Sequence, residues 1–183
     1  IPDSVVKIGD GAFRNCSNLE SFDYGEQELW LGANAFYDSG LKSFYISKNL
    51  YVIEEFALAS LNECEAFIVD EENETFSSED GVLFNKDKTT LIIYPGGSGR
   101  TSYTIPQTVK EIKAESFSYC DLVDVTFGNS VKSIGAYAFA GCDNLICLEA
   151  KTVQETEHFT INFEKGSFVA KNYKQIIEKI YST

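Results

Sequence analysis

The chain repeats one pattern of apolar residues about every 22 to 23 positions. An aliphatic residue is followed, four and five positions later, by a small residue and a large apolar one. The aliphatic residues are Ile8, Leu31, Ile53, Ile112 and Ile134, and the large ones are Phe13, Phe36, Leu58, Phe117 and Phe139. A unit this short cannot fold alone, because ordering its backbone costs ~1 to 2 kcal/mol per residue. The units must therefore stack, and each apolar position becomes a column through the stack.

The spacing of the repeats is regular except at one place. About 59 residues separate Ile53 from Ile112, so one coil carries roughly 37 extra residues. We interpret the 183 residues as a single domain. Its parts are coils at approximately 1–23, 24–45, 46–69, 105–126 and 127–150, an insertion at 70–104, and a C-terminal cap at 151–183.

Each coil contains a short alternating segment that predicts a strand with one face inward. In the coil at 24–45 this places Phe44 and Ile46 in the core and Tyr45 outside. The inward residues of the other coils are Phe22 with Tyr24, Phe67 with Val69, Val125 with Phe127, and Leu148 with Ala150. We expect these strands to form one parallel sheet. A second extended piece at 5–8 and its equivalents, then a turn or a single helical turn around 9–15, should complete each coil.

The insertion has the pattern of a β-hairpin. The β-rich runs 82–84 and 89–94 are joined by a polar turn at 85–88. An isolated hairpin is marginally stable, so its apolar face should pack on neighbouring coils. The hairpin is either a decoration that widens one coil or a ligand-binding element.

The C-terminal cap leaves the repeat and predicts one amphipathic helix at about 167–181. Its apolar residues Val169, Tyr173, Ile176, Ile177 and Ile180 follow helical spacing, and Ser167 is a suitable N-cap. Such a helix would cover the apolar columns of the last coil. The chain begins inside a repeat, so we expect preceding coils or another chain to cover its first coil.

The pattern at 105–122 resembles the BspA-like leucine-rich repeat. It reads Ile-Pro-Gln-Thr-Val-Lys-Glu-Ile at 105–112, then Ser116-Phe117, Cys120 and Leu122. The proline recurs only at Pro2, yet the other copies keep the apolar register. The resemblance implies an α/β leucine-rich-repeat solenoid, a right-handed superhelix that is strand-rich with short helical turns. It also implies a secreted or cell-surface bacterial protein, of a kind associated with adhesion to host proteins or other cells.

The cysteines follow the repeat. Cys16, Cys120 and Cys142 each stand three residues after the large apolar residue, and Cys64 occupies a leucine position. A small apolar group suits these positions, so we predict buried free thiols. A bridge between Cys120 and Cys142 remains compatible with coils ~4.8 Å apart. A zinc site is disfavoured, because paired CxxC spacings and histidine partners are absent.

Composition argues against several functions. A net charge of -13 disfavours nucleic acid and anionic membrane partners, and no apolar run approaches the ~20 residues of a membrane span. His158 is the only histidine, and no spacing in the sequence pairs it with a nucleophile and an orienting acid. We therefore expect no catalytic residue and no cofactor. The acidic run at 70–74 lacks a calcium-loop register, which favours a solvated loop over a metal site.

The outward positions of the predicted sheet are the candidate binding surface. We select Asp23, Tyr45, Ile68, Asp124, Thr126 and Glu149 as partner-binding residues. An exposed aromatic beside an exposed aliphatic residue is a suitable interaction hot spot, although Tyr45 and Ile68 could instead contact the hairpin. The sequence thus favours a non-catalytic module that binds a protein ligand. The alternatives are a structural spacer without a ligand, and a calcium- or carbohydrate-dependent binder that uses the acidic loop.

Overall fold

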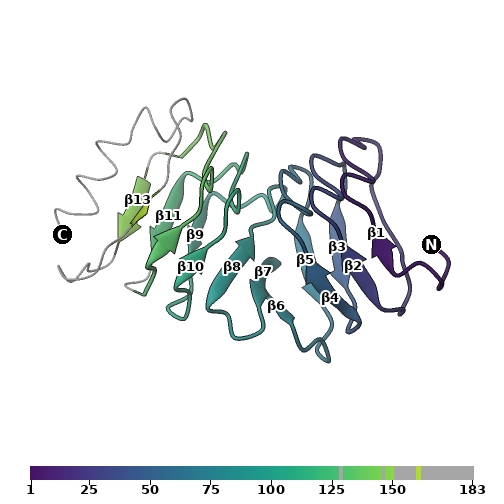
Figure 1. Ribbon diagram of the computed structural model, residues 1–183. Coiled ribbons are helices and arrows are strands. Elements are labelled where there is room, and N and C mark those ends of the chain that lie inside the picture. The colour runs from purple at the N-terminus through teal and green to yellow at the C-terminus, as the bar shows by residue number, and fades with distance from the viewer. Residues whose placement is uncertain (128–129, 146, 151–159, 162–183) are drawn as a thin grey trace.

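The computed structural model is a stack of coils that follow one another along a single axis (Figure 1). It describes residues 1–127, 130–145, 147–150 and 160–161, with side chains described up to residue 145. Fourteen strands are present: β1 (Lys7–Ile8), β2 (Leu29–Leu31), β3 (Ser43–Ile46), β4 (Leu50–Ile53), β5 (Ala66–Val69), β6 (Phe76–Glu79), β7 (Val82–Asn85), β8 (Thr90–Ile93), β9 (Ser102–Thr104), β10 (Glu111–Ile112), β11 (Asp124–Phe127), β12 (Ser133–Ile134), β13 (Cys147–Ala150) and β14 (Thr160–Ile161). The described residues form no helix, and hence none that could cross a bilayer. The predicted helix at 167–181 lies outside the described residues.

The strands form two sets, and a coil typically contributes one strand to each. The first set contains β3 paired with β5, and separately the sheet β9–β11–β13. The second set contains the sheet β1–β2–β4 and the six-stranded sheet β14–β12–β10–β8–β7–β6. Pairing between coils is parallel, with Ile8 beside Leu31 and Ile112 beside Ile134. The repeat register read from the sequence is therefore the register of the sheets.

The prediction of one continuous parallel sheet is wrong, because the insertion interrupts it. The turn between β6 and β7 occupies the free edge of β5. The backbone N–H of Phe67 donates to the Gly81 carbonyl oxygen at 2.9 Å, and the N–H of Val69 donates to the Ser78 hydroxyl at 3.2 Å. Once these donors are engaged, β5 has no edge left for a further parallel strand.

The insertion contains the predicted hairpin, and it also contains a further coil. β7 and β8 pair antiparallel as expected, and β6 adds a third antiparallel strand. β8 then pairs parallel with β10, which places Leu91 beside Ile112, and β9 pairs parallel with β11. Tyr94 stacks on Phe117 with ring centroids 5.1 Å apart. The aromatic column thus continues through this coil, but Tyr94 follows Leu91 by three positions, whereas Phe117 follows Ile112 by five.

The corners of the coils are turns, the first of the two forms expected around 9–15. The short helical turns that the family resemblance implies are absent from the described residues. In each of five corners, two residues four positions apart have a left-handed backbone. The pairs are Gly11 and Asn15, Asn34 and Asp38, Phe56 and Ser60, Glu115 and Tyr119, and Tyr137 and Gly141. Every second N–H of the first corner donates to the next coil, as for Gly11 to the Ala33 carbonyl oxygen (2.9 Å) and Phe13 to the Ala35 carbonyl oxygen (2.7 Å). A helix would keep those bonds within one coil.

The predicted columns form the core. Phe13 stacks on Phe36 at 5.1 Å, and Phe117 stacks on Phe139 at 4.9 Å, with rings within 13° of parallel in both pairs. The predicted inward residues are buried or half-buried wherever side chains are described. Among the cysteines, Cys64, Cys120 and Cys142 are buried as predicted, whereas Cys16 is only partly buried. The aligned aromatic rings confirm that successive coils shelter one another's apolar faces.

The core has two parts that meet at the insertion. Strand β7 is buried on both faces, with Leu83 in the N-terminal core cluster and with Val82 and Phe84 in the C-terminal one. β4 does not pair with β8. A cavity of about 240 Å³ lies where they approach, lined by residues that include Phe56, Leu58 and Ile92.

Candidate interaction surface

Tyr45 and Ile68 form an exposed apolar pair, which we call the Tyr45–Ile68 patch. The two residues lie directly opposite each other in the parallel register of β3 and β5. Their side chains are 41% and 51% exposed, while those of the preceding Phe44 and Phe67 are buried. The alternation of a strand accounts for this, since successive side chains point to opposite faces. The predicted outward orientation of both residues is confirmed.

A hydrogen bond holds the Tyr45 ring in place. Its hydroxyl donates to Asp70 Oδ2 at 2.7 Å. The accepting carboxylate raises the pKa of Tyr45 to about 12, and the same bond lowers the pKa of Asp70. Asp70 Oδ1 also accepts from the Glu72 N–H at 2.8 Å. The insertion thus anchors the tip of Tyr45 and leaves the side chain 41% exposed.

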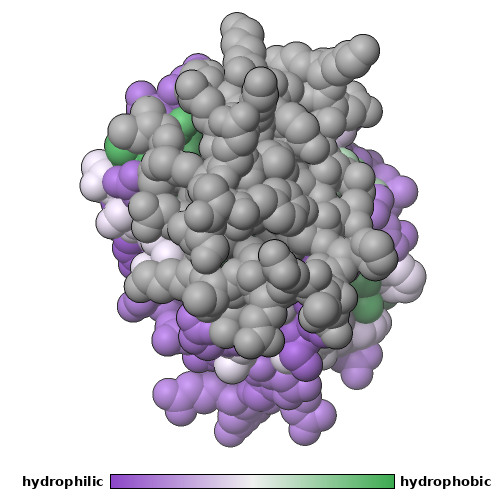
Figure 2. Space-filling model, turned by 90° about the vertical axis from the view of Figure 1, so that its left-hand side faces the viewer, coloured by the Kyte–Doolittle hydropathy of each residue, from purple (hydrophilic) through white to green (hydrophobic). Residues whose placement is uncertain are grey.

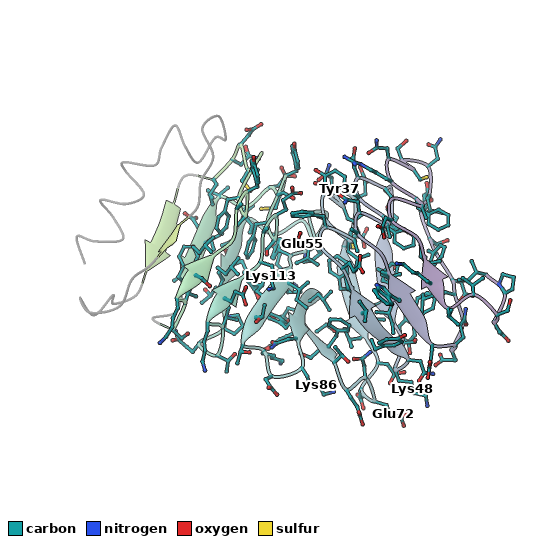
Figure 3. All side chains as sticks on the ribbon, in the orientation of Figure 1. Tyr37, Lys48, Glu55, Glu72, Lys86 and Lys113 are labelled. Carbon is teal, nitrogen blue, oxygen red and sulfur yellow. The ribbon has the colours of Figure 1, made fainter. Side chains whose placement is uncertain are left out.

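Ion pairs flank the patch along the strands. Just before β3 and β5, Lys42 Nζ lies 2.6 Å from Glu63 Oε2. Just beyond the two strands, Lys48 Nζ lies 2.9 Å from Glu72 Oε2 (Figure 3). These pairs are exposed, so they contribute little stability. They place charged side chains at both ends of the two strands, and a polar rim beside an apolar centre is the usual arrangement of a protein interface.

The other predicted binding residues do not join the patch. Asp124 is exposed and Thr126 half-buried on β11, and Glu149 lies opposite Thr126 in the backbone register of β13. These residues belong to the sheet β9–β11–β13, which is separate from β3 and β5. Asp23 is exposed outside any strand, and its Oδ1 accepts from the Gly25 N–H at 3.0 Å. The structure brings Tyr45 and Ile68 together and places the rest elsewhere.

The acidic run at 70–74 is organised by a buried asparagine. Asn73 Nδ2 donates to the carbonyl oxygens of Ser47 at 2.7 Å and Leu50 at 2.9 Å, and its Oδ1 accepts from the N–H groups of Thr75 and Phe76. The amide therefore ties the start of the insertion to the preceding coil. Within the part of the chain that is described, no group of three or more His, Cys, Asp or Glu side chains could hold a metal ion. His158 lies outside the described residues.

A second exposed aromatic residue lies on the other set of strands. Tyr51 on β4 is 46% exposed and borders a groove with Lys48, Asn49, Glu72, Glu74 and Thr75. We did not select it from the sequence, although the alternation of Leu50 and Tyr51 was available as a signal. The described residues along the lower edge of the molecule are mainly hydrophilic (Figure 2). The other residues that line the Tyr51 groove are all polar, unlike the Tyr45–Ile68 patch, where two large apolar side chains lie side by side.

Several solved structures share this architecture. The pneumococcal vaccine antigen PcpA is 29% identical with a TM-score of 0.75, over 82% of this chain and 38% of that one. A leucine-rich cell surface protein from Faecalibacterium prausnitzii is 27% identical with a TM-score of 0.76, over 81% and 40%. A leucine-rich repeat protein from Eubacterium ventriosum is 26% identical with a TM-score of 0.69, over 81% and 46%. The chain thus spans less than half the length of these relatives.

A family comparison agrees with the structural one. No curated protein matches the chain. The model of the BspA type leucine-rich repeat region matches residues 1–97 and 95–179, with six copies of the repeat. The second match extends to residue 179, and β14 (Thr160–Ile161) pairs parallel with β12. The prediction that the segment at 151–183 leaves the repeat is therefore wrong for its first part, because β14 continues the sheet of the coils. This protein is a member of the BspA-type leucine-rich repeat family, whose relatives include bacterial cell-surface proteins and an antigen.

Proposed function

We propose that this protein is a non-catalytic protein-binding module of a secreted or surface-attached bacterial protein, and that it contacts its partner through the Tyr45–Ile68 patch. The supporting observation is the pairing of two large apolar side chains, 41% and 51% exposed, on one sheet face. Neighbouring exposed apolar side chains of this kind often mark a site of protein contact. Their polar rim of Lys42, Glu63, Lys48 and Glu72 suits a contact with another folded protein.

The membership of the family supports the location. One relative is a cell surface protein and another is a vaccine antigen, so both are accessible at the outside of a bacterium. A surface-attached protein of this kind would meet host proteins and neighbouring cells. Adhesion is therefore the binding role that we propose.

The test is a charge substitution in the patch. The double variant Tyr45→Asp, Ile68→Asp should bind at least about tenfold more weakly than the unmodified chain, because it removes the apolar centre. Binding is measured by biolayer interferometry against a panel of immobilised human extracellular matrix proteins and epithelial surface proteins. Tyr119→Asp is the matched control, since Tyr119 is 53% exposed but lies in the corner of another coil, away from Lys48 and Glu72 in the sequence and outside the groove that they line.

Two results would contradict the proposal. If the double variant captures its partner as well as the Tyr119→Asp control does, the patch is not the binding surface. If the unmodified chain binds no protein of either group, the structural spacer becomes the better account.

A calcium- or carbohydrate-dependent binder is the other alternative. The run at 70–74 would supply the oxygen ligands or the sugar contacts. Two separate experiments distinguish this alternative: calorimetric titration with CaCl2, and binding of the protein to a glycan array. Partner binding through the patch requires neither calcium nor a glycan.

A further inference from the structure

Two buried cysteines face each other across adjacent coils. Cys120 Sγ and Cys142 Sγ are 3.4 Å apart, and their residues are 2% and 0% exposed. Both occupy the same position of the repeat, three residues after Phe117 and Phe139. The backbone holds the two corners in register, since the Tyr119 N–H donates to the Ala140 carbonyl oxygen at 2.7 Å. The contact is therefore a product of the stack and not of flexible side chains.

We propose that Cys120 and Cys142 form a redox-active pair that closes into a disulfide between consecutive coils. A disulfide needs an S–S distance of about 2.05 Å and Cα atoms about 4.4 to 6.8 Å apart. Adjacent strands of a parallel stack lie ~4.8 Å apart, which is inside that range. The two sulfurs must approach by roughly 1.4 Å, a shift that small rotations about χ1 supply.

The repeat makes this pair specific. Cys16 occupies the same position in the first coil, but Ser39 takes the corresponding position in the next coil. Cys64 occupies a different column, and its burial raises the pKa of that thiol to about 12, which disfavours the reactive thiolate. Cys120 differs, because its contact with the Cys142 sulfur lowers the pKa of Cys120. Cys120 is thus the better nucleophile, and Cys142 is the resolving thiol.

The chemistry requires an oxidant, for which we name a low-molecular-weight disulfide. Both sulfurs are buried, so the oxidant reaches Cys120 when the corner of the coil opens locally. The Cys120 thiolate then attacks one sulfur of the oxidant, forms a mixed disulfide and releases one small thiol. Cys142 then loses its proton, attacks Cys120 Sγ and displaces the second small thiol. Two protein thiols are oxidised to one disulfide and one small disulfide is reduced to two thiols, so atoms and electrons balance.

The experiment exposes the purified protein to oxidised glutathione, and in parallel to reduced glutathione, followed by mass spectrometry and thermal unfolding. The oxidised protein should lose two hydrogen atoms in intact mass. Trypsin should release the peptides 114–132 and 133–151 as one linked species. Fragmentation must place the link at Cys142, because the second peptide also contains Cys147. The Tm should rise by about 5 °C or more, since the bond restricts the unfolded chain, and reduction should reverse the rise.

The matched controls use the same position of the repeat. Cys120→Ser should abolish the linked peptide and the rise in Tm, whereas Cys16→Ser should keep both. The proposal is overturned if both thiols remain open to alkylation in denaturant after prolonged oxidation, or if the link joins other cysteines. Mapping the link in the unmodified protein decides the question even where Cys120→Ser fails to fold.

Discussion

At the scale of single residues, the most informative contact is the one between Tyr45 and Asp70. The hydroxyl-to-carboxylate distance of 2.7 Å joins a residue of the candidate surface to the first residue of the insertion. The sequence suggested that Tyr45 either faces a partner or contacts the hairpin. The structure combines the two, because the tip of the ring is bonded to Asp70 while the side chain remains 41% exposed.

The Tyr45–Asp70 contact predicts a specific titration. The pKa of Tyr45 should be about 12 in the folded protein, and Asp70→Asn should return it toward the ordinary value of about 10. The measurement is 13C NMR of ring-labelled tyrosine across the alkaline range, with Tyr45→Phe to assign the signal. An unchanged Tyr45 pKa in Asp70→Asn would show that the bond does not form in solution.

The sign of the stability effect follows from the two shifts. The pKa of Asp70 is lowered by folding, so its contribution is present above the unfolded value of about 4 and is lost as pH falls through the folded value. The pKa of Tyr45 is raised, so its contribution is present below about 10 and is lost as pH rises through about 12. The contact therefore stabilises the fold across the neutral range.

At the scale of elements, close approach of backbones decides which residues a corner accepts. Gly9 and Gly135 occupy the same position, directly after the aliphatic residue of the repeat. A Cβ at Gly135 would lie 2.3 Å from the backbone nitrogen of Ala114, whereas a Cβ at Gly9 would meet nothing within 4 Å. The difference arises because Gly135 packs on a preceding coil.

Two alanine substitutions test this packing. Gly135→Ala should lower the free energy of unfolding by about 1 to 3 kcal/mol through the clash with Ala114. Gly9→Ala should change it by less than about 0.5 kcal/mol. Both are measured by urea unfolding followed by circular dichroism. Equal stability of the two variants would mean that the coils are farther apart than the structure places them.

At the scale of the whole molecule, the insertion joins two cores. β7 contributes Leu83 to the N-terminal cluster and Phe84 to the C-terminal cluster. The strand is consequently buried on both faces, unlike the strands whose outer side chains meet solvent. This joint, together with the adjacent cavity of about 240 Å³, is where the stack departs most from a regular solenoid.

Substitutions on the two faces of β7 should destabilise different halves. Leu83→Ala should reduce amide protection mainly in 29–58, and Phe84→Ala mainly in 105–139, each at a cost of about 2 to 5 kcal/mol. Hydrogen exchange with mass spectrometry measures both, and Asp87→Ala in the exposed turn is the control. Equal loss in both halves from either variant would show instead that the stack unfolds as one unit.

The repeat, the apolar columns and the outward orientation of Tyr45 and Ile68 were all predictable from the sequence. Each depends on local periodicity, because a side chain's direction follows from its place in a strand and each column follows from the register. The coil inside the insertion was not predictable in the same way, since Tyr94 follows Leu91 by three residues instead of five. A fixed-spacing pattern cannot find a coil whose corner is shorter.

The sequence alone determined that this chain must stack its coils, because no single unit buries enough apolar surface to offset its entropy. Only the tertiary structure decided how the stack is divided. The turn at Gly81 takes the edge of β5 and separates the Tyr45–Ile68 patch from the sheet that holds Asp124, Thr126 and Glu149. The reason is physical: one strand edge offers its hydrogen bonds to only one neighbour, and which neighbour takes them depends on contacts distant in the sequence.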